Sequence, residues 1–126
     1  MLVIDAYKSR DIAIADVPGA YLHALWPKGK KVLLKLRGKF VNIMCNVNLE
    51  YKKYIIYEGK KKQKVLYLRV LRALYGCIES ALLWYNLYSK TLKDMGFEIN
   101  PYDKCIMNKT INGSQCSIAF MWMTIR

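Results

Sequence analysis

The sequence predicts an α+β fold, in which short strands and one clear helix pack around a shared hydrophobic core. Three observations support this prediction. Apolar residues recur at helical spacing over residues 80–95, β-prone runs flank turn sequences at two places, and 54% of the 126 residues are hydrophobic while 24% are charged. A chain of this length can bury one modest core, so we expect one domain or a part of one.

The first predicted strand covers residues 11–16, a short segment rich in Ile and Ala that is followed by a turn sequence at Pro18 and Gly19. We expect this strand to be buried, with Asp16 at its carboxyl end. A carboxylate in that position needs a cation, or it caps the turn that follows. The residues themselves leave both interpretations open.

Three further strands are predicted in the middle of the chain. Residues 32–36 form one candidate, and residues 51–57 and 65–70 are runs of Tyr and β-branched residues on either side of a basic segment. This arrangement predicts a hairpin whose tip could contact a phosphate backbone, although a solvated turn is the simpler interpretation. The tip contains Lys60, Lys61, Lys62 and Lys64.

A helix over residues 80–95 is the clearest predicted element, because apolar side chains there fall three and four residues apart and form one stripe. Ser80 suits the N-cap, and Gly96 suits the position just after the helix. An aromatic stripe at this spacing is far more often core than cofactor site, so we assign it to the core. Its members are Ala81, Trp84, Tyr85, Tyr88, Leu92 and Met95.

A second hairpin is predicted near the carboxyl end, where residues 105–111 and 115–121 flank the dipeptide Asn112-Gly113. This dipeptide is the strongest short signal for a two-residue hairpin turn.

The four cysteines are Cys45, Cys77, Cys105 and Cys116, and their spacing is not paired. Because His23 is the only histidine, a zinc site is not expected, and we interpret the cysteines as buried apolar residues.

The chain is strongly basic, with 21 Lys and Arg against nine acidic residues, a net charge of +12 and a pI near 9.6. This balance favours a polyanionic partner such as nucleic acid, with a solvated basic face as the alternative. No apolar run approaches the length that spans a bilayer, and the amino terminus lacks a signal pattern. We therefore expect an intracellular chain, cytoplasmic or nuclear, with no membrane partner.

Six short blocks of residues follow one another in a specific order. They are Ala15-Asp16-Val17, Tyr21-Leu22-His23, Ala73-Leu74-Tyr75-Gly76, Trp84-Tyr85, Gly96-Phe97 and Pro101-Tyr102-Asp103-Lys104-Cys105. Together they resemble the reverse transcriptase of copia-type retrotransposons, over most of the chain and least over residues 25–57. The resemblance implies that residues 1–126 are a partial palm and fingers domain of the right-hand polymerase fold, truncated at both ends, with an antiparallel sheet packed on helices.

The resemblance also implies roles for four residues. Asp16 matches the first catalytic aspartate, which in such enzymes binds both Mg²⁺ ions that act on the primer 3′-hydroxyl and the leaving pyrophosphate. Tyr21 matches the aromatic residue under the incoming sugar, and Tyr75 and Gly76 match a turn that lines the nucleotide and template pocket. The implied cofactor is Mg²⁺, and the implied partners are an RNA or DNA template-primer and a dNTP.

Two departures from the family pattern bear on activity. Glu79 stands where the family has a neutral amide, and its carboxylate would repel a template phosphate or a triphosphate. Family enzymes follow the last hairpin with Tyr-Val-Asp-Asp, whose acidic pair completes the metal site, whereas this chain has no acidic residue after Asp103. Because one aspartate cannot hold two Mg²⁺ ions, we expect a nucleotidyltransferase by family that is catalytically inactive as this chain.

A second hypothesis, from a different class, is a noncatalytic basic module that binds nucleic acid. It would use the four tip lysines together with Lys28, Lys30 and Lys31.

The missing acidic motif is present in a shifted reading frame. Met121, Trp122 and Met123 have single codons, ATG TGG ATG, and ACN follows for Thr124. Reading from the last nucleotide of the Phe120 codon gives Tyr or His, then Val, Asp and Asp. We therefore hypothesise that the gene lost one nucleotide near the Phe120 codon.

The coding DNA tests this hypothesis directly. We expect the shifted frame to continue downstream of the Val-Asp-Asp codons with recognisable polymerase sequence, because a single deletion leaves the remaining nucleotides intact. A shifted frame without such sequence would show that the frameshift hypothesis is wrong.

Overall fold

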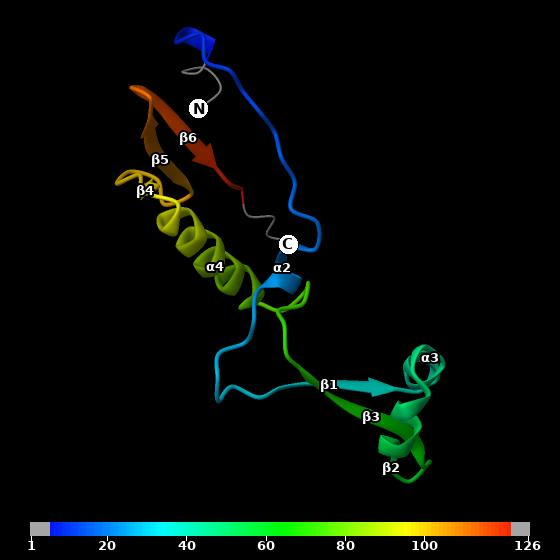
Figure 1. The fold of residues 1–126 in the computed structure, drawn as a ribbon. Coiled ribbons are helices and arrows are strands. Elements are labelled where there is room, and N and C mark those ends of the chain that lie inside the picture. Colours follow the sequence, from blue (N-terminus) through cyan, green and yellow to red (C-terminus); the bar gives the residue numbers. More distant parts are fainter. Residues whose placement is uncertain (1–5, 122–126) are drawn as a thin grey trace.

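The structure is a computed structural model that describes residues 6–121 (Figure 1). It confirms the α+β class, with two small antiparallel sheets and a few helices. The first sheet has the strand order β1 (Val32–Arg37), β3 (Gln63–Val70), β2 (Ile56–Glu58). The second has the order β4 (Glu98–Ile99), β5 (Ile106–Ile111), β6 (Ser114–Ala119).

The helices are α2 (Ala20–His23), α3 (Lys39–Val47), the 3₁₀ helix η1 (Leu49–Tyr54) and α4 (Ser80–Asp94). The first sheet with α3 and the second sheet with α4 lie at opposite ends of the molecule (Figure 1). Across the described residues, none of these helices combines the length and the apolar character that crossing a membrane requires.

One small core lies between α3 and the first sheet. The register of β1 and β3 places Leu36 opposite Leu66, so both side chains lie on the same face. Val41 and Cys45 of α3 cover that face, and Val41 and Leu66 are completely buried. The expectation of buried cysteines is therefore confirmed for Cys45, while the other three are half-buried.

A second core lies between α4 and the second sheet. Leu92, Phe97 and Met107 are buried there, and Tyr88 and Ile118 pack against them. Tyr88 and Leu92, two members of the stripe predicted for α4, thus face this core, as the helical spacing indicates.

The carboxyl end of α4 closes with a Schellman motif. Gly96 has a φ of 86°, which a residue with a side chain rarely adopts. The backbone N–H of Phe97 donates to the C=O of Leu92 at 3.0 Å, and Lys109 Nζ donates to the C=O of Met95 at 2.6 Å. Gly96 is therefore the helix stop that the sequence predicts, and Lys109 satisfies a further terminal carbonyl.

Both predicted hairpins are present. Asn112 and Gly113 have φ values of 49° and 79°, the two positive values that a type I′ turn requires, and they join β5 to β6. Residues 59–62 form the turn between β2 and β3.

The prediction of a buried strand over residues 11–16 is wrong. These residues are exposed and lie outside any strand, and the side chain of Ile14 is 96% exposed. Within the described residues, no neighbouring strand pairs with them, and an extended segment without a partner has no ladder of backbone hydrogen bonds. The turn at Pro18 and Gly19 is present, so the error lies in the pairing and not in the turn.

Three smaller predictions are also wrong. Residues 51–54 belong to η1 instead of a strand, because the Asn48 side chain caps the start of that helix. Ser80 is the first residue of α4 and not its N-cap, and its Oγ accepts a hydrogen bond from the N–H of Leu74 at 3.1 Å. Met95 lies past the end of α4 and is 57% exposed.

Met107 provides a test of the second core. Its side chain is 0% exposed, so we expect Met107→Ala to leave a cavity and to lower the free energy of unfolding by about 2–5 kcal/mol. Met95→Ala is the matched control, with an expected change of about 0.5 kcal/mol or less. Urea denaturation measures both, and equally small losses would contradict the core assignment.

Candidate functional site

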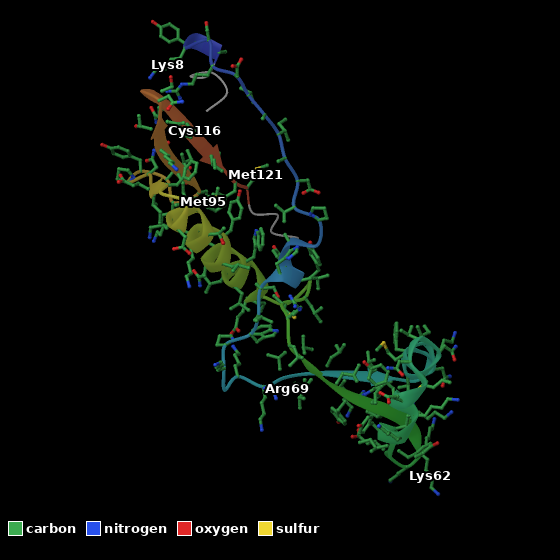
Figure 2. All side chains as sticks on the ribbon, in the orientation of Figure 1. Lys8, Lys62, Arg69, Met95, Cys116 and Met121 are labelled. Atoms are coloured by element: carbon green, nitrogen blue, oxygen red, sulfur yellow. The ribbon has the colours of Figure 1, made fainter. Side chains whose placement is uncertain are left out.

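Apart from Asp16, the residues assigned to substrate or to the hairpin tip from the sequence fall into two separate regions. Tyr21, Tyr75 and Gly76 lie near the start of α4, whereas the four tip lysines lie at the far end of the first sheet, where Figure 2 labels Lys62.

Backbone hydrogen bonds join the segment after α2 to the segment before α4. The N–H of Trp26 donates to the C=O of Leu71 at 3.1 Å, and the N–H of Ala73 donates to the C=O of Ala24 at 2.8 Å. Both alanines are buried. Two segments that are far apart in the sequence are therefore fixed side by side, and the residues next to them are brought into contact.

Tyr21 and Tyr75 stack on each other as a result. Their ring centroids are 4.6 Å apart, with an angle of 28° between the planes. Tyr21 is half-buried in α2, and Tyr75 is exposed. Gly76 follows with a φ of 90°, and an added Cβ would meet nothing within 4 Å. The positive φ accounts for a glycine at position 76, and the space beside its Cα is open.

Asp16 does not join this cluster. It is exposed, and the turn at Pro18 and Gly19 separates it from Tyr21. It makes neither a hydrogen bond nor an ion pair with the described residues, so the expected cation partner and the expected turn cap are both missing there. Over residues 6–121, no three His, Cys, Asp or Glu side chains are grouped so that they could hold a metal ion. The described residues therefore do not fit the implied pair of Mg²⁺ ions.

Glu79 has a cation partner that the sequence did not indicate. Its Oε2 pairs with Nζ of Lys30, and the same Nζ lies 5.3 Å from the ring centroid of Trp26. The salt bridge with Lys30 offsets part of the negative charge of Glu79, which was expected to repel phosphate groups. All three strands of the first sheet lie between Lys30 and Glu79 in the sequence, which is why the spacing of residues could not reveal this contact.

The rings on α4 contact one another, in line with a core function. Trp84 and Tyr88 stack with centroids 5.4 Å apart, and Tyr88 meets Phe120 edge to face at 5.0 Å. Tyr85 Oη donates a hydrogen bond to the C=O of Lys104 at 3.3 Å.

The tip lysines of the β2–β3 hairpin are exposed, and none of them pairs with an acidic side chain among the described residues. Glu58, the acidic residue at the base of the tip, is engaged elsewhere. Its Oε2 accepts a hydrogen bond from Lys35 Nζ at 2.5 Å, and its Oε1 accepts one from Tyr67 Oη at 2.8 Å. The positive charge of the tip is therefore directed to solvent.

The hydrogen bond between Lys35 and Glu58 shifts the pKa of both side chains. It lowers the pKa of Glu58, with Tyr67 adding to the effect, and it raises the pKa of Lys35. Both residues stay charged over the neutral range, so Lys35 is not free to bind an anion.

The second hypothesis combines the four tip lysines with Lys28, Lys30 and Lys31, and these two groups lie apart in the structure. Val32 pairs with Val70, and Arg37 pairs with Val65, so the register spans five residue steps. Lys31 and Lys64 lie one residue beyond opposite ends of this pairing, so they are seven residue steps, or about 23 Å, apart along the strands. Lys28, Lys30 and Lys31 therefore lie apart from the tip, and Lys30 is also paired with Glu79.

Comparison of the chain with models of protein families, with curated proteins and with solved structures found no match. The ordered motifs and the geometry of the described residues are therefore the basis for assigning a function.

Proposed function

We propose that the chain derives from a copia-type reverse transcriptase and does not catalyse RNA-directed DNA synthesis as this chain. The stacking of Tyr21 on Tyr75 is the main support. These residues come from two different blocks of the ordered motif series, and a nucleotide pocket of this family requires both blocks at one place. Their contact is what the common ancestry would produce.

The palm and fingers assignment belongs to the same proposal. A palm is an antiparallel sheet with helices on one face, and the second sheet with α4 has this layered form. The first sheet with α3 would then be the part that belongs to the fingers. The two separate cores are compatible with this division.

The proposed loss of activity follows from metal chemistry. Two-metal nucleotidyl transfer needs several carboxylates that bind both ions at once. In the shifted frame the two aspartate codons fall at Met123 and Thr124, so the chain has no carboxylate at either position. Among residues 6–121, Asp16 belongs to no group of three or more His, Cys, Asp or Glu side chains that could hold a metal ion. A single exposed carboxylate does not position two ions for in-line displacement.

Primer extension on an RNA template with Mg²⁺ and dNTPs tests the proposed inactivity. We expect no incorporation above background, because the acidic set is incomplete, while an active reverse transcriptase extends the same primer. The control variant is Asp16→Ala. Incorporation by the unaltered chain that disappears in Asp16→Ala would overturn the proposed inactivity.

A basic nucleic-acid-binding module is the second candidate. The observation that favours it is the hairpin tip, where Lys60, Lys61, Lys62 and Lys64 are all exposed and have no acidic partner among the described residues. Phosphate contacts of this kind release counterions, so the affinity falls with salt and depends little on sequence.

A salt titration of single-stranded RNA binding tests this second candidate. Replacing the four tip lysines with Gln is expected to reduce the slope of log K against log salt by about 3, because each phosphate contact contributes about 0.7. Fluorescence anisotropy at several salt concentrations measures the slope.

The matched control removes the same charge from other exposed positions and should change the slope much less. It replaces Lys8, Lys90, Lys93 and Lys104 with Gln. An affinity that does not respond to salt, or equal effects of the two quadruple variants, would exclude the tip as a nucleic-acid site.

A further inference from the structure

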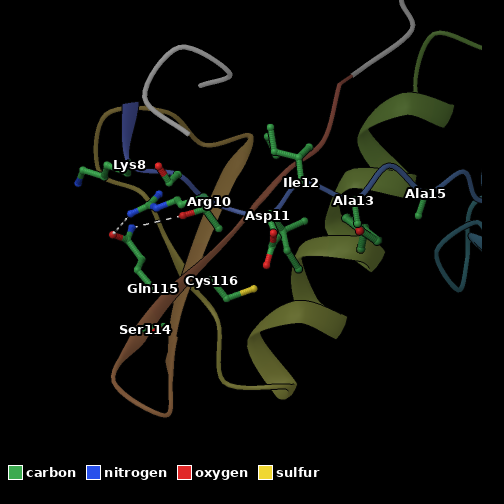
Figure 3. A pocket seen from close by; sticks show the side chains of 14 residues that line it. Lys8, Arg10, Asp11, Ile12, Ala13, Ala15, Ser114, Gln115 and Cys116 are labelled. Atoms are coloured by element: carbon green, nitrogen blue, oxygen red, sulfur yellow. Dashed lines mark hydrogen bonds between the residues drawn. The ribbon is translucent and has the colours of Figure 1, made fainter. Parts of the chain in front are cut away.

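A cavity of about 890 Å³ lies between the amino-terminal segment and the second sheet (Figure 3). Residues 8–13 and Ala15 line one side, residues 114–119 of β6 line the other, and Tyr88 of α4 contributes as well. Tyr21, Tyr75 and Gly76 do not line it. The cavity is therefore separate from the Tyr21 and Tyr75 cluster.

The cavity lies at an open edge of the second sheet. In the order β4-β5-β6, β6 is the outer strand, and among the described strands it pairs with β5 alone. Residues of β6 line the cavity whereas residues of β5 do not, so the cavity lies on the side of β6 that faces away from β5.

The hydrogen-bond phase of the β5–β6 ladder shows which backbone groups face this edge. A two-residue turn makes Ile111 and Ser114 a hydrogen-bonded pair, and such pairs alternate along an antiparallel ladder. The N–H of Phe120 donates to the C=O of Cys105 at 3.0 Å, which agrees with this phase.

It follows that the backbone N–H and C=O groups of Gln115, Ser117 and Ala119 point away from β5. They form a row of donors and acceptors along the open edge, which is the pattern that another strand recognises. The side chains of Cys116 and Ile118 pack into the core beside α4, so this edge has an apolar side. Its polar side includes Ser117, whose Oγ donates to Oδ1 of Asn108 at 2.7 Å.

The cavity has room for one added strand. A strand of six residues, the length of β6, is about 20 Å long, occupies about 4.8 Å of sheet width and extends about 10 Å in thickness. The product is about 950 Å³, the same order as the cavity volume of about 890 Å³.

The cavity wall opposite β6 also has a form that can accommodate an added strand. Residues 11–17 run extended and in the same direction as β6 (Figure 1). Arg10 Nη2 donates to Gln115 Oε1 at 3.2 Å and fixes one end of this wall against β6 (Figure 3). Ile12 is 53% exposed, so apolar surface on this segment is uncovered.

We propose that this cavity binds an extended polypeptide strand from another molecule, which adds to the open edge of β6. The ligand is a segment of about six residues with alternating side chains. Its apolar residues lie on the side of Cys116, Ile118 and Tyr88, and its polar residues lie on the side of Gln115 and Ser117. The main-chain hydrogen bonds supply the affinity, and the alternation supplies the selectivity.

Amide hydrogen exchange measured by NMR on the full chain tests this proposal. The probe is a synthetic peptide that copies residues 105–111 with Cys105→Ser, because β5 already pairs with β6 with the required alternation. In the free protein, the amides of Gln115, Ser117 and Ala119 should exchange about tenfold or more faster than those of Cys116 and Ile118. Saturating peptide should slow the first three about tenfold and leave the other two unchanged.

Two substitutions at one position provide the matched comparison. Ser117→Pro removes an N–H that faces the edge, a position at which strands accept proline, and should weaken peptide binding about tenfold or more. Ser117→Ala also loses the hydroxyl but retains the N–H, and it should bind the peptide as the unaltered chain does. Slow exchange at Cys116 and Ile118 verifies that each variant is folded.

Three results would overturn the proposal. The three outward amides could be as protected in the free protein as those of Cys116 and Ile118, which would mean that residues 11–15 close on β6 themselves. The peptide could leave these amides unaffected, or it could bind equally well to Ser117→Pro. The exchange measurement on the unaltered chain is decisive even if the proline variant does not fold, and it is independent of nucleotide or nucleic-acid binding.

Discussion

The backbone hydrogen bond from Ala73 to Ala24, with its neighbour from Trp26 to Leu71, is the interaction on which the arrangement of the molecule depends. Each sheet has its own small core, and neither core includes residues of the other. The two paired segments flank the first sheet in the sequence, one before β1 and one after β3. Their pairing brings α2 against the start of α4 and thereby places Tyr21 on Tyr75. Because Ala24 and Ala73 are both buried, losing the hydrogen bond between them would leave an unsatisfied buried group at a cost of about 1–3 kcal/mol.

The electrostatics of the chain follow from a shortage of acidic residues. Two of its nine carboxylates, Glu58 and Glu79, each bind one lysine, so both are engaged within the fold. The remaining positive charge is exposed, most densely at the tip of the β2–β3 hairpin. Asp16 contrasts with these pairs, because it has no cation partner among the described residues. A carboxylate inherited from a metal site would be left in this state once the ion and the other ligands were lost, and this interpretation links the proposed ancestry to the proposed inactivity.

The sequence predicts those elements whose cause is local. The type I′ turn at Asn112 and Gly113 requires two positive φ values, which this dipeptide adopts readily, and Gly96 terminates α4 for the same kind of reason. Residues 11–16 were predicted incorrectly because a strand exists only where another strand supplies hydrogen bonds, and no local pattern contains that information. At η1, a side-chain cap from Asn48 overrides the β preference of the tyrosines that follow.

By itself, the sequence determined the α+β class, the two hairpins, the apolar face of α4, the excess of positive charge and the resemblance to a polymerase family. Each of these depends on composition or on residues close together in the chain. Tertiary structure alone decided that Tyr21 meets Tyr75, that Lys30 pairs with Glu79, that the two lysine groups are apart and that β6 has an open edge. These features join or separate residues that are distant in the sequence, and strand pairing and packing, which act through space, determine them.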